Sequence, residues 1–205
     1  MPARPHDLLR LSDLSALRHH HEDAPDWVWR SLRDVPWVVV RGARARGGHV
    51  AVGVRGRARR ERYALDIPVG AVAARVRPEE LRRRLGDLPA DSAPARTAAA
   101  LTAWLDTLDR AGLVWGPTGS VGFQLATGRS VVTQHSDLDL IVRLDALRAA
   151  DAIPALPCVP GRVDCLVEGA EGAVAFGELA NGSRLIMLRT PGGRRLVART
   201  TLTAV

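Results

Sequence analysis

Residues 136–144 read SDLDLIVRL, and the strict alternation in this stretch decides the fold class. Side chains two residues apart on a β-strand share a face, so the pattern predicts one strand with an apolar side and a charged side. The charged side carries Asp137 and Asp139. The apolar side carries the aliphatic residues of the alternation, which are Leu138, Leu140, Val142 and Leu144.

The two carboxylates on this strand imply a cation beside them. Like charges on one face repel each other, so such a pair persists only next to a compensating positive charge. A divalent metal ion is the usual solution, and hard carboxylate oxygens suit Mg²⁺. Taken alone, Asp137 and Asp139 also fit a solvated strand edge.

A Gly-Ser pair upstream of this strand predicts a phosphate-binding turn. Gly119 and Ser120 directly precede a predicted helix over residues 121–127. The start of a helix offers free backbone N–H groups and a positive dipole end to an anion. Gly119 would let the backbone approach the anion closely, and Ser120 would add a hydroxyl donor. Taken alone, the same pair also fits an ordinary helix cap.

A third carboxylate lies on a further predicted strand over residues 162–168, which read RVDCLVE. Asp164 is flanked there by the apolar Val163 and Cys165. Three acids and a phosphate cradle together predict a two-metal site for phosphoryl transfer. In this interpretation Asp137, Asp139 and Asp164 are the catalytic residues and the ligands of two Mg²⁺ ions.

The order of predicted elements indicates a mixed α/β fold with two domains. Residues 1–90 are predicted to form a strand-rich N-terminal domain and residues 91–205 a domain with a mixed sheet, whose Gly-Ser and Asp motifs resemble those of a nucleotidyltransferase-type catalytic domain. The boundary is placed in the Pro-, Ala- and Ser-rich stretch 88–97. Strands are predicted over 35–41, 49–55, 62–67, 113–115, 183–189 and 194–199, and helices from Pro78 and over 96–111 and 172–180.

The composition is that of an ordinary globular protein. The chain has 205 residues, of which 46% are hydrophobic and 25% charged, enough for one large domain or two small ones. It contains no apolar run of about 18 residues, so no membrane span or membrane partner is expected. The first residues lack an apolar signal region, and Cys158 and Cys165 match no zinc spacing. We therefore expect a cytoplasmic protein.

All 29 basic residues are arginine, against 22 acidic residues, which gives a net charge of +7. A GC-rich genome accounts for the absence of lysine. The absence still excludes Schiff-base chemistry and a P-loop lysine. Arginine binds phosphates and carboxylates in a bidentate manner, so an anionic substrate or an acidic partner is expected.

Three arginines are candidate substrate-binding residues. Arg55 and Arg57 share a face if the basic stretch 55–62, RGRARRER, is extended, and they are expected to bind phosphates or an acidic protein surface. A solvated turn is the alternative. Arg143 lies on the strand face of the acid pair and is expected to contact a phosphate. Nucleic acid is not an expected partner, because no aromatic residues alternate with the basic stretch to stack on bases.

These motifs resemble a known superfamily. GS at a helix start, DLDL on a strand and an isolated Asp on a neighbouring strand are similar to the nucleotidyltransferase superfamily of DNA polymerase beta. The longer sequence segments around these motifs resemble the malonate decarboxylase holo-acyl-carrier-protein synthase family, also called phosphoribosyl-dephospho-CoA transferase. These segments are WGPTGSVGFQLATG (115–128), HSDLDLIVR (135–143) and RVDCLVE (162–168). The N-terminal segments 5–11, 36–42 and 51–65 are similar to that family too.

The resemblance implies a specific reaction. The donor would be 2'-(5''-triphosphoribosyl)-3'-dephospho-CoA, and the acceptor a serine of the acyl carrier protein subunit of malonate decarboxylase, with pyrophosphate released. It implies that Asp137 and Asp139 bridge two Mg²⁺ ions and that Asp164 holds the ion that activates the serine. Gly119 and Ser120 would hold the departing phosphates.

Other functions remain open from the sequence alone. The chain could be another Mg²⁺-dependent nucleotidyltransferase that acts on a small molecule or on RNA. It could also be a binding or regulatory protein with a vestigial fold of this type. The carrier subunit of citrate lyase, which bears the same prosthetic group, is a second possible acceptor.

Overall fold

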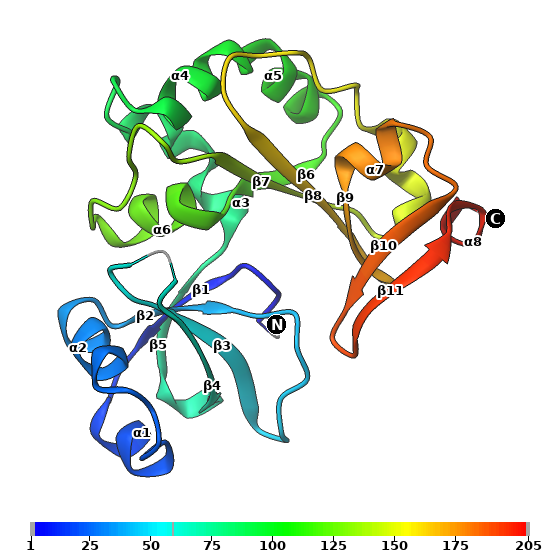
Figure 1. Cartoon of the computed structure of the whole chain (residues 1–205). Coiled ribbons are helices and arrows are strands. Elements are labelled where there is room, and N and C mark those ends of the chain that lie inside the picture. Colours follow the sequence, from blue (N-terminus) through cyan, green and yellow to red (C-terminus); the bar gives the residue numbers. More distant parts are fainter. Residues whose placement is uncertain (1–2, 59, 204–205) are drawn as a thin grey trace. The chain divides into compact units, whose positions relative to one another are not determined.

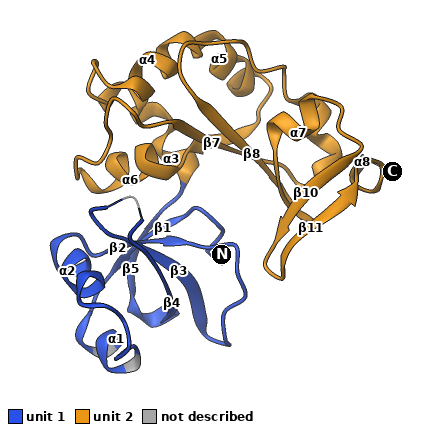
Figure 2. Ribbon diagram, in the orientation of Figure 1, with its two compact units in different colours: residues 1–77 blue, residues 78–205 orange. Residues whose placement is uncertain are grey.

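The computed structural model describes residues 3–58 and 60–203 and divides the chain into two compact units, residues 1–77 and 78–205 (Figure 2). This division precedes the position near residue 90 that the sequence predicted. The reason lies at the start of unit 2, where the buried Pro78 packs its carbonyl group against Gly116. The stretch taken for a linker instead begins a helix, because the Ser92 side chain accepts a hydrogen bond from the backbone N–H of Ala95 at 3.3 Å.

Unit 1 is a five-stranded sheet with helices packed on it (Figure 1). The strand order is β4-β3-β2-β1-β5, and all neighbours are antiparallel. The elements are β1 Leu8–Leu11, α1 Ser15–His20, α2 Asp26–Asp34, β2 Trp37–Val40, β3 His49–Arg55, β4 Arg62–Pro68, a 3₁₀ turn Val69–Ala71 and β5 Val72–Val76.

The core of unit 1 forms between helix α2 and the sheet. One side of α2 is apolar, and Val28, Trp29 and Leu32 on that side are buried. They belong to the same buried cluster as Val52 of β3 and Ile67 of β4. Burial of such side chains contributes about 1.5–3 kcal/mol each to folding, so α2 fixes this face of the sheet.

Unit 2 is a six-stranded mixed sheet in the order β11-β10-β9-β8-β7-β6. Only β7 and β8 run parallel to each other among the described strands, and the other neighbours are antiparallel. The strands are β6 Val114–Pro117, β7 Leu138–Arg143, β8 Val163–Gly169, β9 Gly172–Ala175, β10 Leu185–Thr190 and β11 Gly193–Ala198. The helices are α3 Pro78–Leu81, α4 Ala93–Ala100, α5 Thr102–Arg110, α6 Gly119–Thr127, α7 Phe176–Ala180 and α8 Arg199–Thr203, with 3₁₀ turns Arg82–Asp87 and Leu147–Ala152.

Helices cover both faces of this sheet at β6 and β7 (Figure 1). Trp115 points to one face, where its indole Nε1 donates a hydrogen bond to Asp109 of α5 at 3.0 Å. The next residue, Gly116, faces the other side and touches α3, because a Cβ there would overlap the Pro78 carbonyl group. Helices α4 and α5 therefore lie on the first face, and α3 and α6 on the second. No helix among the described residues is long and apolar enough to cross a bilayer.

The mixed α/β fold with a strand-rich N-terminal part is as predicted, but some elements differ. The predicted helix over 96–111 is broken at Leu101 into α4 and α5. The predicted helix over 172–180 begins as strand β9, because Ala173 and its neighbours pair with β8 and β10. Strands β1 and β5 were not predicted.

Candidate active site

The two acids predicted on separate strands are direct neighbours. Strands β7 and β8 pair in parallel with Asp139 opposite Asp164 and Leu138 opposite Val163. Opposed residues on paired strands point to the same face, so both carboxylates lie on one side of the sheet. Asp139 is partly buried, whereas Asp164 is exposed. The sheet thus presents one carboxylate that is held by its surroundings and one that is open to a substrate.

Asp137 lies directly before β7 and has a basic partner. Its Oδ1 atom is 3.4 Å from Nε of Arg162, the residue before β8. The backbone fixes this approach, because the Leu138 N–H donates to the Arg162 carbonyl oxygen at 2.9 Å. The Arg162 side chain is 81% exposed. A positive charge therefore stands beside the acid cluster, as the like-charge repulsion of the acids requires.

The Gly-Ser turn packs directly on Asp139. The Thr118 N–H donates to the Asp139 carbonyl oxygen at 2.8 Å, which ties the turn to β7. Gly119 has φ +59°, and a Cβ there would overlap the Asp139 carboxylate. Only glycine permits this conformation and this close approach without strain. The turn and the acid predicted to act together are therefore in contact.

Helix α6 starts at this turn, so its first backbone N–H groups belong to the segment that touches Asp139. Its N-cap residue Thr118 makes no side-chain capping bond, and the first N–H groups of any helix lack intrahelical acceptors. Ser120 is largely buried in the first turn. Gln124 holds the loop after α6, because its Oε1 accepts from the backbone N–H groups of Val131 and Val132 at 2.9 and 2.8 Å.

The three acids are not pre-assembled as a metal-binding group. No cluster of three or more His, Cys, Asp or Glu side chains within residues 3–58 and 60–203 is arranged to hold an ion. The backbone nevertheless brings Asp139 and Asp164 side by side, and carboxylate oxygens are the donors that Mg²⁺ prefers. Carboxylates at these backbone positions are suitable ligands for Mg²⁺. Their side chains would have to rotate toward one another to coordinate the ion.

Arg143 lies away from this cluster, in the interior of unit 2. Its side chain is 1% exposed, and its Nε is 3.5 Å from Glu168 and 3.8 Å from Glu79. The alternation placed Arg143 correctly on the face of Asp139, but four residues further along β7. The structure therefore pairs Arg143 with the carboxylates of Glu168 and Glu79 and does not bring it to the turn predicted to bind phosphate.

Comparison with known proteins identifies the family. Residues 81–200 match the model of the phosphoribosyl-dephospho-CoA transferase MdcG C-terminal domain, and residues 4–78 match the model of its N-terminal domain. The chain belongs to this family of transferases. It is 41% identical over 202 residues to the phosphoribosyl-dephospho-CoA transferase of Azotobacter vinelandii, covering 95% of this chain and 92% of that protein.

Two further relatives carry the same name. The protein of Pseudomonas putida is 39% identical over 199 residues, covering 95% of this chain and 93% of that protein. The protein of Pseudomonas aeruginosa is 40% identical over 196 residues, covering 90% of this chain and 87% of that protein. No solved structure matches the chain. The sequence resemblance to this transferase family is thus confirmed, and placement in the polymerase beta superfamily stays a prediction.

In this transferase the predicted basic residues Arg55 and Arg57 belong to unit 1. Arg57 is exposed, and its Nη2 donates to Oδ2 of Asp34 at 3.1 Å. It helps to line a cavity of about 330 Å³ at the end of α2, together with Trp27, Arg30, Ser31, Arg33, Asp34 and Glu61. Arg55 is partly buried at the end of β3. The two arginines thus have different surroundings within unit 1.

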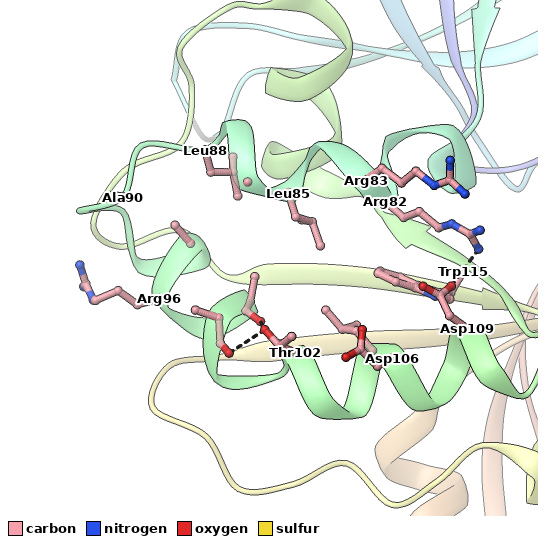
Figure 3. Close-up of a pocket in the computed structure, with 15 residues that line it drawn as sticks. Arg82, Arg83, Leu85, Leu88, Ala90, Arg96, Thr102, Asp106, Asp109 and Trp115 are labelled. Carbon is pink, nitrogen blue, oxygen red and sulfur yellow. Dashed lines mark hydrogen bonds and ion pairs between the residues drawn. The ribbon is translucent and has the colours of Figure 1, made fainter.

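A larger cavity of the transferase, about 500 Å³, lies between helix α5 and the 3₁₀ turn Arg82–Asp87 (Figure 3). Trp115 lines it and pairs with Val142. Val142 and Asp139 alternate along β7 and therefore point to opposite faces. The rim carries the ion pair of Arg82 with Asp109, at 3.0 Å. This cavity does not include the acid cluster.

Two neighbours of the acids complete the description of the site. Arg162 is the positive neighbour of Asp137, and the alternation of the RVDCLVE segment places it on the face of Asp164. Cys165 follows Asp164 and points to the opposite face, where burial and, secondarily, the Asp164 charge raise the pKa of its thiol to about 12. Cys165 therefore stays protonated and inert beside the site.

Proposed function

We propose that this transferase moves the 2'-(5''-phosphoribosyl)-3'-dephospho-CoA prosthetic group from its triphosphoribosyl donor to a serine of the malonate decarboxylase acyl carrier protein subunit. In this reaction a bond forms between the serine Oγ and the phosphorus attached to the ribose. The bond from that phosphorus to the departing pyrophosphate breaks. We also place the reaction in the cytoplasm, because both described cysteines are unpaired and one of them is exposed.

The observation that carries the proposal is the register of β7 and β8. It sets Asp139 beside Asp164 on one face and, through Gly119, sets the helix start against Asp139. Phosphoryl transfer requires carboxylates for cations and hydrogen-bond donors for the leaving phosphates within one small region. Those two requirements meet where strands β7 and β8 begin, in a chain whose relatives carry the name of this transferase.

The residues of the chain take distinct roles in this proposal. The N–H groups at Gly119 and Ser120 hold the departing phosphates, since they open helix α6. Asp164 is exposed and accepts the proton of the attacking serine hydroxyl. Asp137, Asp139 and Asp164 would hold Mg²⁺, which when bound neutralises charge on the phosphates. No covalent bond to the enzyme is needed, in keeping with an inert Cys165.

Intact mass spectrometry of the carrier subunit tests the proposal. The purified apo-carrier is incubated with this protein, Mg²⁺ and the triphosphoribosyl donor, beside a reaction without metal and one with the citrate lyase carrier. We expect a metal-dependent mass gain equal to the donor minus pyrophosphate on the malonate decarboxylase carrier. No gain on a carrier whose serine is free contradicts the proposal and favours a nucleotidyltransferase that uses a nucleoside triphosphate. A gain on the citrate lyase carrier alone would reassign the acceptor.

A further inference from the structure

The hairpin of β10 and β11 exposes apolar and basic side chains together. Leu185 and Leu196 are 57% and 60% exposed. Arg189 and Arg194 lie directly opposite each other on the two strands. Alternation places all four side chains on one face of the hairpin. We call Leu185, Arg189, Arg194 and Leu196 the hairpin surface.

The hairpin surface lies on the same sheet face as the catalytic acids. A row of opposed residues crosses the sheet from Arg143 on β7 to Glu168, Ala173, Arg189 and finally Arg194 on β11. Opposed residues share a face, as do residues an even number of positions apart on one strand. Arg143 and Glu168 come four residues after Asp139 and Asp164, so the two pairs share a face. The hairpin surface lies on that same face.

Leu185 also lies at the same end of the sheet as Asp164. Strands β8 and β10 both run antiparallel to β9, so they run in the same direction. Arg189 is level with Glu168, and Leu185 and Asp164 each come four residues earlier. At this level strand β9 has ended at Ala175, and helix α7 lies between β8 and β10. A protein that covers Leu185 and extends past α7 can therefore present a side chain to Asp164.

The charge of this region favours an acidic partner. Residues 179–205 contain five arginines and no acidic residue. A phosphate backbone would satisfy the arginines but would leave Leu185 and Leu196 exposed to water. A protein surface with carboxylates around apolar side chains satisfies both.

We propose that the hairpin surface is the docking site for the acidic face of the acceptor protein. This inference rests on the proposed function, which makes a carrier protein the acceptor. Leu185 and Leu196 pack against apolar side chains of the carrier, and Arg189 and Arg194 pair with its carboxylates. A carrier that docks there and extends past α7 brings its serine to the exposed Asp164.

Two neighbouring arginines provide a matched test. Arg194 belongs to the hairpin surface. The exposed Arg195 is paired with Leu188 and points to the other face of the hairpin. R194E and R195E change the net charge equally. We expect R194E to raise the KM for the apo-carrier roughly tenfold, with kcat and the donor KM unchanged, and R195E to stay within about twofold of wild type. Leu196→Ser removes the apolar contact without a charge change and should act like R194E.

Direct binding separates this inference from the proposed function. Calorimetric titration of the apo-carrier into the full-length protein needs no donor and no metal. Weaker binding by R194E and Leu196→Ser than by R195E supports the docking site, even if wild type fails to transfer the group. Equal carrier binding by all three variants overturns it, as does wild type that neither binds nor modifies the carrier. The docking site is also overturned if R194E and Leu196→Ser bind the carrier as wild type does but lose an RNA complex or a dimer that wild type forms.

Discussion

The two ends of the β7–β8 pair carry charged residues in the same register but in opposite circumstances. At one end Asp139 faces Asp164, two like charges of which one is exposed. At the other end Arg143 faces Glu168, two opposite charges that are buried. Both pairs lie on the same face of the same two strands, four residues apart.

The difference assigns stability to one end of this strand pair and, under the proposed function, catalysis to the other. When a buried ion pair loses one partner, the other charge is left uncompensated in a medium of low dielectric constant. A change of register would separate Arg143 from Glu168, so this end favours the native register. A like-charge pair contributes repulsion unless a cation is present. The buried end, joined to α3 through Glu79, therefore holds the strands in the register that keeps the two acids together.

The largest effect is expected from loss of an acid at the open end. Asp139→Asn should lower the rate of transfer at least about a thousandfold, because a charge beside the reacting phosphates is removed. The variant should stay folded, because asparagine has the size and shape of aspartate. Steady-state kinetics and thermal unfolding measure the two effects. The exposed Asp145, which follows β7, provides the control Asp145→Asn, and comparable rates in both variants would remove Asp139 from the site.

The buried end should respond in stability. Arg143→Met should cost about 3–5 kcal/mol in the free energy of unfolding, because Glu168 and Glu79 lose their positive partner. Arg162→Met removes the exposed partner of Asp137 and should cost no more than about 1 kcal/mol. Urea unfolding measures both. If the two substitutions cost the same, the buried pair is not what holds the register.

A smaller effect is expected at the turn that touches Asp139. Gly119→Ala should reduce the rate about a hundredfold, because its Cβ displaces the Asp139 carboxylate. Gly128→Ala is the matched control, since Gly128 has φ +71° but open space around it. Both variants pay the strain of a left-handed alanine, about 1 kcal/mol. Only Gly119→Ala should lose activity, and equal losses would mean that backbone strain alone is responsible.

The smallest effect concerns the thiol beside Asp164. Because burial and the Asp164 charge raise the pKa of Cys165 to about 12, this thiol carries no thiolate at pH 8–9. A thiol reagent should therefore label only the exposed Cys158 in the folded protein, and both cysteines in urea. Labelling should leave the transfer rate unchanged. Rapid reaction of two thiols in the native protein would show that β8 opens at the site.

Alternation made the centre of unit 2 predictable from sequence. The stretch around Leu138 and the RVDCLVE segment both form strands, and the expected helix follows Gly119. Period-2 patterns report which face a side chain takes, and the faces of Asp139 and Asp164 follow from them. Strand β5, VAARV, carries a weak pattern with two exposed alanines, and its pairing with β1 at the far side of the sheet is a tertiary effect.

The partners of the site residues depend on segments distant in sequence. The pattern gives the face of Arg143, but Glu79 of α3 comes from another part of the chain and only folding brings it near. The same holds for the contact between Gly119 and Asp139. The sequence placed the unit boundary near residue 90 because Pro-rich composition marks helix starts as well as linkers. Pro94 in fact stands in the first turn of α4.

The parallel pairing of β7 and β8 also has a consequence for folding order. Parallel neighbours cannot be joined by a tight turn, so residues 144–162 must cross over before Asp139 meets Asp164. The hairpin of β10 and β11 needs only a short turn at Pro191 and Gly192. Local contacts close faster than those that span long loops. The surface proposed for the acceptor can therefore form early, whereas the proposed active site must await the crossover. Refolding assays should recover transfer activity last.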